Sequence, residues 1–201
     1  IKIMSGIVGS YFNTRGSGIV AKLGTDGQVF TSTGAGLKQG FEAAGGGGIF
    51  ESELLHIRDE KANNTGGGNT TTAFLTRDLN TVKTNEITGA SLASDQITLP
   101  AGTYYIEADV PQIQGDSNGV QLYNTTDTAA VIIGTNVYNS SHNWLNNTPS
   151  SIRGRFTIAG EKVFEIQHKV GTADSTGKGL GFPSNVSLIN IYTEVLIWKV
   201  S

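Results

Sequence analysis

Cysteine is absent from this 201-residue chain, which excludes disulfide bridges and thiolate metal sites. Its absence also argues against a small secreted eukaryotic domain, because such domains usually carry disulfides. Charged residues make up only 15 % of the sequence, and the net charge is -3. Nucleic acid is not an expected partner, because phosphate binding needs clustered Lys and Arg and the sequence has no basic run.

Long apolar runs are missing as well. No segment approaches the roughly 20 apolar residues of a membrane span, and Ile1–Gly6 lacks the apolar stretch of a secretion signal. We therefore expect no membrane partner. The sequence does have 27 glycines and a hydrophobic content of 37 %. This composition favours a compact body with polar turns over a disordered chain.

Strand signals recur from about Ala73 onward. One seven-residue stretch alternates between two faces, with Tyr104, Ile106, Ala108 and Val110 on one and Tyr105, Glu107 and Asp109 on the other. Such alternation is typical of a half-buried antiparallel strand. Further strands are predicted at 97–99, 120–123, 130–133, 152–158, 163–170 and 186–200. Many short strands separated by Gly, Asn and Pro turns predict an all-β sandwich or jelly roll.

Four consecutive glycines, Gly45 to Gly48, predict a flexible joint. They divide the chain into an N-terminal attachment region, 1–48, and a head domain, 49–201. Within the first region, Asp26-Gly27 predicts a turn that leads into a short strand at Val29–Thr31. At the start of the second, Ile49–Arg58 fits either a short helix or a strand.

The last predicted strand is apolar on both faces. Val195 and Ile197 point one way, and Leu196, Trp198 and Val200 point the other. A strand of this kind should be covered on both sides. One face meets the core of the sandwich, so the other face is covered by the N-terminal region, another subunit, or long loops of the same domain. We take Val195, Ile197 and Trp198 as candidates for a subunit interface.

Aromatic and amide side chains gather in the predicted loops and predict a binding surface. They combine an apolar face with polar groups, which suits sugars and protein epitopes. The candidate residues are Tyr123, Tyr138, His142, Asn143, Trp144 and Asn146. The alternative is that Trp144 anchors its own loop against the body.

No residue set predicts catalysis, a cofactor or a metal site. Glu107 and Asp109 share a strand face at about 6.5 to 7 Å, a spacing that suits glycoside hydrolysis but is common on a polar sheet surface. The loop Gly171–Gly179 is similar to a phosphate loop, but it has one residue too many and Gly179 replaces the required Ser or Thr. His168 shares a face with apolar residues, which favours a packed histidine over a metal ligand, although a threefold axis would bring three copies together.

Three motifs, in order, resemble those of the complement globular-head domains in the tumour necrosis factor-like jelly-roll superfamily. They are Leu99-Pro100-Ala101-Gly102-Thr103-Tyr104-Tyr105-Ile106, the hairpin Phe156–Phe164, and the closing Glu194-Val195-Leu196-Ile197-Trp198. The resemblance covers about residues 73–201. It implies a homotrimer of jelly rolls around a threefold axis, with intertwined N-terminal strands. The calcium site frequent in that family is not clearly supplied here.

A separate motif, Gly24-Thr25-Asp26-Gly27-Gln28-Val29-Phe30-Thr31-Ser32-Thr33-Gly34-Ala35-Gly36, resembles a module of phage tail fibres and other virion appendages. Phe30 stands where that module usually has Leu. The resemblance implies a virion protein attached to other virion proteins through its N-terminal region. The expected function is therefore a trimeric fibre or tip of a tailed bacteriophage that binds a host surface glycan or protein. The alternatives are a capsid decoration protein (a head fibre or cement trimer) and a polysaccharide-degrading appendage enzyme.

Overall fold

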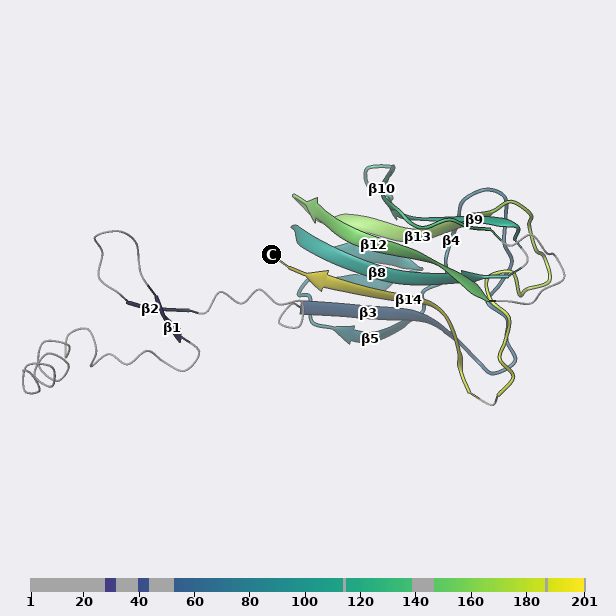
Figure 1. Ribbon diagram of the computed structural model, residues 1–201, viewed down its shortest axis with the longest axis horizontal. Helices are drawn as coiled ribbons and strands as arrows, with labels where there is room; N and C mark the ends of the chain where they lie inside the picture. The colour runs from purple at the N-terminus through teal and green to yellow at the C-terminus, as the bar shows by residue number, and fades with distance from the viewer. Residues whose placement is uncertain are drawn as a thin grey trace, which may run out of the picture. The chain divides into compact units, whose positions relative to one another are not determined.

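The computed structural model describes residues 28–31, 40–43, 53–113, 115–138, 147–186 and 188–200 (Figure 1). The chain divides into two compact units, Ile1–Gly47 and Gly48–Ser201. In the first unit, β1 (Gln28–Thr31) pairs with β2 (Gly40–Ala43) in antiparallel register. The short strand predicted after Asp26-Gly27 is thus confirmed.

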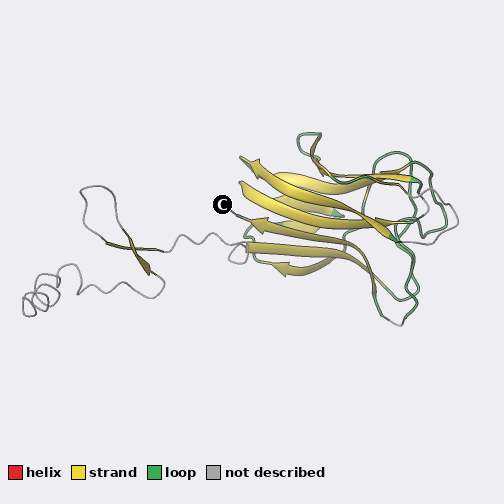
Figure 2. Cartoon of the chain, viewed as in Figure 1, coloured by secondary structure: helices red, strands yellow, loops and turns green. Residues whose placement is uncertain are grey.

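The regular structure of the second unit is entirely β in its described residues (Figure 2). One sheet has five strands in the order β12 (Thr148–Ile158), β8 (Gly102–Gln112), β14 (Asn190–Lys199), β3 (Glu53–Lys61) and β5 (Thr81–Asn85). The other has the order β10 (Ala129–Ile133), β9 (Ser117–Asn124), β13 (Lys162–Val170), β7 (Gln96–Leu99) and β6 (Ser91–Ala93). Two short strands extend this second sheet: β11 (Val137–Tyr138) pairs with β9, and β4 (Leu75–Thr76) pairs with β13.

Every strand pair is antiparallel, and the chain crosses repeatedly from one sheet to the other. Two facing sheets with such crossings form a jelly-roll sandwich. The all-β jelly-roll fold expected from the sequence is confirmed. No helix in the part of the chain that the structure describes is long and apolar enough to cross a membrane.

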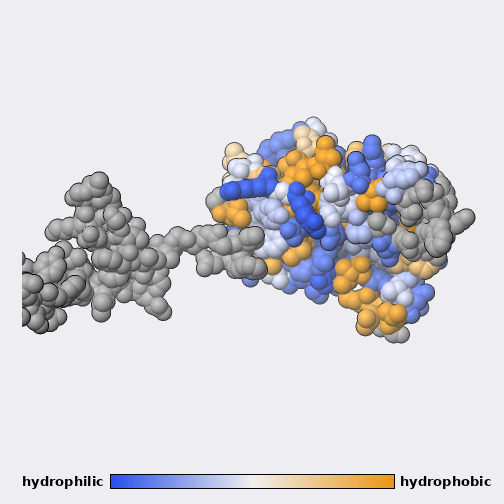
Figure 3. All heavy atoms as spheres, in the orientation of Figure 1, coloured by the Kyte–Doolittle hydropathy of each residue, from blue (hydrophilic) through white to orange (hydrophobic). Residues whose placement is uncertain are grey.

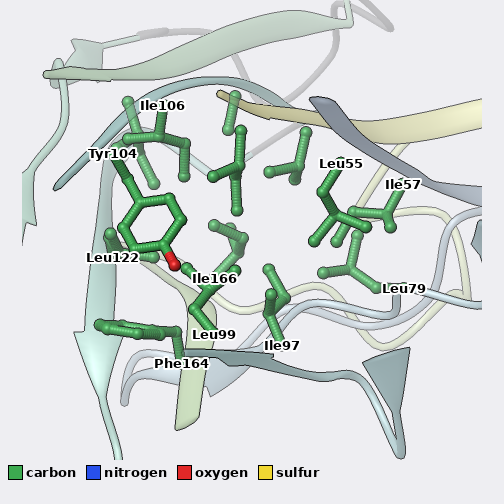
Figure 4. Packing of buried hydrophobic residues seen from close by; sticks show 14 of the residues in the cluster. Leu55, Ile57, Leu79, Ile97, Leu99, Tyr104, Ile106, Leu122, Phe164 and Ile166 are labelled. Carbon is green, nitrogen blue, oxygen red and sulfur yellow. The ribbon is translucent and has the colours of Figure 1, made fainter. Parts of the chain in front are cut away.

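The core lies between the inward faces of the two sheets (Figure 4). Leu55 and Ile57 of β3 are fully buried there, as are Val195 and Ile197 of β14. The Tyr104 ring stacks on Phe156 with centroids 5.5 Å apart, and Phe156 lies 5.4 Å from Phe164. Burying one large apolar side chain stabilises the fold by about 1.5–3 kcal/mol, so this face-to-face contact dominates the stability of the sandwich.

Two sequence-based expectations need adjustment. The segment 49–58, which fitted a helix or a strand, contributes to β3 from Glu53 onward because Leu55 and Ile57 alternate into the core. The last strand was expected from Val186, but β14 begins at Asn190. Its pairing with β3 is interrupted by a register shift between Ile191 and Glu194.

The core becomes polar toward one end of the sandwich. Arg77, with 0 % exposure, donates hydrogen bonds to Thr193 Oγ1 at 2.9 Å and to the Leu180 carbonyl at 3.0 Å. Burial lowers the pKa of Arg77 to about 10, while the nearby carboxylates of Asp59 and Asp78 act to raise it. The guanidinium therefore stays protonated at neutral pH and ties the loop before β14 to the buried end of the domain.

Replacing Arg77 by Ala should destabilise the domain strongly. The substitution leaves a cavity at a fully buried position and removes the donors to Thr193 Oγ1 and the Leu180 carbonyl, whereas Asp59 keeps Lys61 at 3.2 Å. Each buried acceptor left without a partner costs about 1–3 kcal/mol, and the cavity adds to that cost. Urea denaturation should show this loss, whereas Arg153→Ala, at a side chain 60 % exposed, should change the stability by less than about 1 kcal/mol. Equal midpoints for the two variants would contradict the structural role of Arg77.

His168 is 1 % exposed, and neither ring nitrogen has a hydrogen-bond partner among the described residues. Burial, with a smaller contribution from the charge of Arg77, lowers its pKa to about 3. The folded protein thus holds His168 neutral, as the sequence-based expectation of a packed histidine required.

The domain should lose stability in acid partly through His168. The unfolded chain takes up a proton on this ring below its ordinary pKa of 6.5, whereas the folded chain does so only near pH 3. The resulting loss, up to about 1.4 kcal/mol per pH unit, develops as the pH falls from 6.5 to 3. In His168→Leu the plot of unfolding free energy against pH should be shallower over this range. An unchanged slope would show that His168 is not held neutral.

Candidate functional site

The outward face of the five-stranded sheet carries an unusual row of apolar side chains. Trp198 of β14 lies opposite Leu54 of β3 on one side and Tyr105 of β8 on the other. The rings of Tyr105 and Trp198 have centroids 6.0 Å apart. All three side chains are half-buried although no second layer covers them within the described residues. We call this row, together with its neighbour Leu196, the apolar row.

Charged side chains beside the apolar row pair with one another. Glu194 accepts hydrogen bonds from Arg58 Nε at 2.7 Å and His56 Nε2 at 2.8 Å. Arg58 also lies 3.7 Å from Glu60, which in turn is 3.2 Å from Lys83. These pairs neutralise one half of the sheet face, so the face presents an apolar row next to a self-compensated charged patch.

Glu194 is ionised over the whole neutral and mildly acidic range. Partial burial acts to raise its pKa, but the hydrogen bonds from Arg58 and His56 outweigh burial, so the pKa lies below its ordinary value. The network holds Glu194, Arg58 and His56 in one arrangement on the sheet face. This order suits a surface that contacts a partner of fixed shape.

The structure divides the three candidate interface residues between two faces. Val195 and Ile197 have 0 % exposure and pack in the core of a single chain. Their assignment to a subunit interface was wrong, because the inward face of β14 is already covered by the second sheet. Trp198 lies on the outward face beside Leu54 and Tyr105 and stays a candidate.

A groove of about 560 Å³ opens at the other sheet, where β9, β11 and β13 lie side by side. Its described lining residues are mostly polar or small: Thr72, Ser117, Asn118, Gly119, Asn136, Val137, Tyr138, Lys169, Val170 and Gly171. Tyr138 is 72 % exposed, while Asn118 is 3 % exposed. Neither side-chain atom of the Asn118 amide has a hydrogen-bond partner in the described part of the chain.

The predicted loop residues do not form one cluster among those described. Tyr138 lines the groove. Tyr123 lies on β9 six residues beyond Ser117, the pairing partner of Tyr138, which places it about 20 Å along the strand. His142, Asn143, Trp144 and Asn146 lie outside the described residues. Sequence reasoning missed Asn136 and Lys169, because only the strand pairing places them near Tyr138.

The two carboxylates on β8 take part in ordinary contacts of a sheet surface. Tyr105 donates a hydrogen bond to Glu107 at 3.1 Å, and Ser151 donates one to Asp109 at 2.7 Å. No group of three or more His, Cys, Asp or Glu side chains that could hold a metal ion occurs in the described ranges.

Exposed aliphatic side chains lie just before β14 and at its start. Val186, Leu188, Ile189 and Ile191 are 62 %, 66 %, 55 % and 42 % exposed. Hydrophobic residues gather at the lower edge of the domain in Figure 3, where Figure 1 shows the chain running into β14. We call these four residues the aliphatic loop. A contiguous exposed apolar surface of this kind marks a contact with another molecule.

A scan against protein-family models finds no match, and a search of the curated proteins finds none either. Among solved structures, murine APRIL at pH 5.0 is similar with a TM-score of 0.49 and 10 % identity, covering 74 % of this chain and 99 % of that one. The globular domain of zebrafish complement 1qA protein is similar with a TM-score of 0.45 and 15 % identity, covering 75 % and 98 %. The assignment as a jelly roll rests on the strand order of this chain.

Proposed function

We propose that this chain is a structural protein of a tailed-bacteriophage virion. In this proposal it forms a homotrimeric fibre or tip, joined to other virion proteins through residues 1–48, and its jelly-roll head binds the host cell surface. The observation that carries the proposal is the apolar row of Leu54, Tyr105, Leu196 and Trp198 on an outward sheet face.

The apolar row has the composition of the centre of a protein interface. Interface centres are enriched in Trp and Tyr and depleted of charge, while polar groups gather at the rim. Here Trp198 and Tyr105 lie next to one another, and the Glu194–Arg58–His56 network borders them. Three copies that meet through this face bury the row, while Glu194 keeps its partners Arg58 and His56.

The appendage role is supported by the first unit of the chain. Residues 24–36 resemble the module of phage fibres, and β1 forms within that stretch. The division of the chain falls in the run of four glycines, between Gly47 and Gly48. A separate unit joined by glycines suits a part that docks on a particle while the head contacts something else.

The aliphatic loop favours a second candidate, a capsid decoration protein. Val186, Leu188 and Ile189 present apolar surface without hydrogen-bonding groups, which suits a protein partner better than a sugar. In that role the loop would pack on a neighbouring shell subunit and stabilise the shell.

The purified chain should be a trimer that depends on the apolar row. Light scattering at micromolar concentration should give about three times the 21.2 kDa of one chain. Trp198→Glu places a charge in the proposed interface and should shift the mass to that of a single chain. Ile133→Glu, at an exposed position (76 %) of the other sheet, should stay trimeric. A monomeric wild-type protein, or a trimeric Trp198→Glu variant, would remove the proposed assembly.

Particle location tests the virion role and separates its two forms. Antibody labelling or a particle reconstruction should place the protein at the tail of the phage that encodes it. A location on the shell, with loss of shell stability but normal adsorption after deletion of the gene, would select the decoration role. Purified particles that lack the protein altogether would exclude both.

A further inference from the structure

We propose that the interior of the sandwich contains a binding site for a small cluster of ordered water molecules, where β8 ends and β9 begins. The inference goes beyond the proposed function and does not depend on it. Five buried residues form the site, and we call them the polar layer: Arg77, Gln112, Asn118, Ser150 and His168.

Eight side-chain atoms of the polar layer have no hydrogen-bond partner in the described part of the chain. They are Arg77 Nη1, Ser150 Oγ, and both side-chain polar atoms of Gln112, Asn118 and His168. Three of the five residues have 0 % exposure, and His168 and Asn118 have 1 % and 3 %. Nearly all buried polar groups in proteins are paired, because leaving one unpaired is costly. Eight such atoms in one layer therefore indicate a partner from outside the chain.

The second sheet supplies two residues of the polar layer. In β9, Asn118 alternates in phase with Val120 and Leu122, which belong to the apolar core. In β13, His168 is the register partner of Val120, and Val170 is the partner of Asn118. Asn118 and His168 are thus diagonal neighbours on one inward face, with Cα atoms about 7–8 Å apart.

The five-stranded sheet supplies two more residues. Ser150 of β12 pairs with Val110 of β8, two positions before Gln112, so Ser150 and Gln112 are diagonal neighbours on the inward face. The Gln112 side chain also reaches the facing sheet, because a Cβ built on Gly115 would touch both Gln112 Oε1 and the Val170 side chain. The two halves of the polar layer therefore meet across the interior.

Arg77 joins the layer beside His168. Its backbone N–H donates a hydrogen bond to the Ile166 carbonyl at 2.8 Å, two residues before His168 in β13. Its charge also contributes to the low pKa of the His168 ring, as expected for neighbouring groups. Nε and Nη2 of Arg77 are bound to Thr193 and Leu180, which leaves Nη1 for the polar layer.

Apolar residues enclose the polar layer from both sides. Ile113, Val170 and Leu180 are 1 %, 4 % and 3 % exposed, yet they do not belong to the main core cluster. Along β13, His168 lies between Ile166, which is part of that cluster, and Val170. The layer thus separates the main core from a small apolar cap, so a molecule held there is shielded from bulk solvent.

The hydrogen-bonding groups of the layer match water. The amides of Gln112 and Asn118 and the hydroxyl of Ser150 each donate and accept, and a neutral His168 ring does one of each. Water has the same mixed character, and it bridges polar atoms that are too far apart for a direct bond. A buried water makes about three hydrogen bonds, so eight atoms suit a cluster of about three waters.

An anion fits the layer less well. The positive charge of Arg77 is already opposed by the nearby carboxylates of Asp59 and Asp78. An anion would also lie against the amide oxygens of Gln112 and Asn118, which can only accept hydrogen bonds.

The test is a near-atomic crystal structure of the full chain, from crystals soaked in bromide. About three ordered waters should lie within hydrogen-bond distance of the polar layer, with no anomalous bromide peak there. In solution, magnetic relaxation dispersion of the water oxygen counts the long-lived internal waters. Asn118→Leu, which removes two of the eight atoms at similar volume, should lower that number by at least one. Gln112→Leu, on the facing sheet, should do the same and serves if Asn118→Leu does not fold.

Gln121→Leu is the matched control. Gln121 is a buried amide on the same strand, but it lies on the outward face and donates a hydrogen bond to Gln167 at 2.8 Å. Its replacement should leave the number of long-lived waters unchanged. A dry layer whose side chains bond to one another, a bromide peak within it, or an unchanged water number in the folded Asn118→Leu or Gln112→Leu variant would each overturn the proposal. Thermal unfolding midpoints establish which variants are folded.

Discussion

The contact between the inward faces of the two sheets holds the head domain together, and the alternation of side chains along each strand determines what is left for the surface. β14 illustrates this constraint, because Val195 and Ile197 enter the core while Leu196 and Trp198 point outward. The same strand therefore supplies both the fold and the candidate subunit contact. A slip of one residue in its register would exchange the two sets and lose both.

Much of the fold follows from the sequence because period-two alternation is a local signal. β8, β12 and β13 lie where alternating residues predicted strands. Within β8, Tyr104 is buried and Tyr105 is half-buried, as expected for side chains on opposite faces of the sheet. The start of β14 was misplaced because Val186 and Leu188 are as apolar as a strand interior, although they lie in an exposed loop. Hydrophobicity alone cannot distinguish a side chain that packs in the core from one that awaits a partner.

The candidate sites were harder to predict because they depend on strand pairing. The sequence showed that β14 is apolar on both faces, but only the facing sheet shows which face is already covered, so Val195 and Ile197 were assigned wrongly. Glycine roles are equally hidden in the sequence. Gly181 has φ of 148°, and a Cβ there would strike the Tyr192 ring, whereas a Cβ at Gly119 would make only ordinary contacts with Asn136 and Lys169. The fold therefore requires glycine at position 181 and tolerates a side chain at position 119.

The order of the strands also gives the head domain a direction. β3 begins at Glu53, and its pairing partner Lys199 ends β14, so the chain enters and leaves the domain at one pole. The turn from Leu99 to Gly102 lies at this pole, while Gln112, Ser117 and Val170 lie at the opposite one. A reporter protein attached beyond the end of β14 would therefore emerge at the pole away from the groove. A reporter protein that is required at the opposite pole has to be inserted into a loop there.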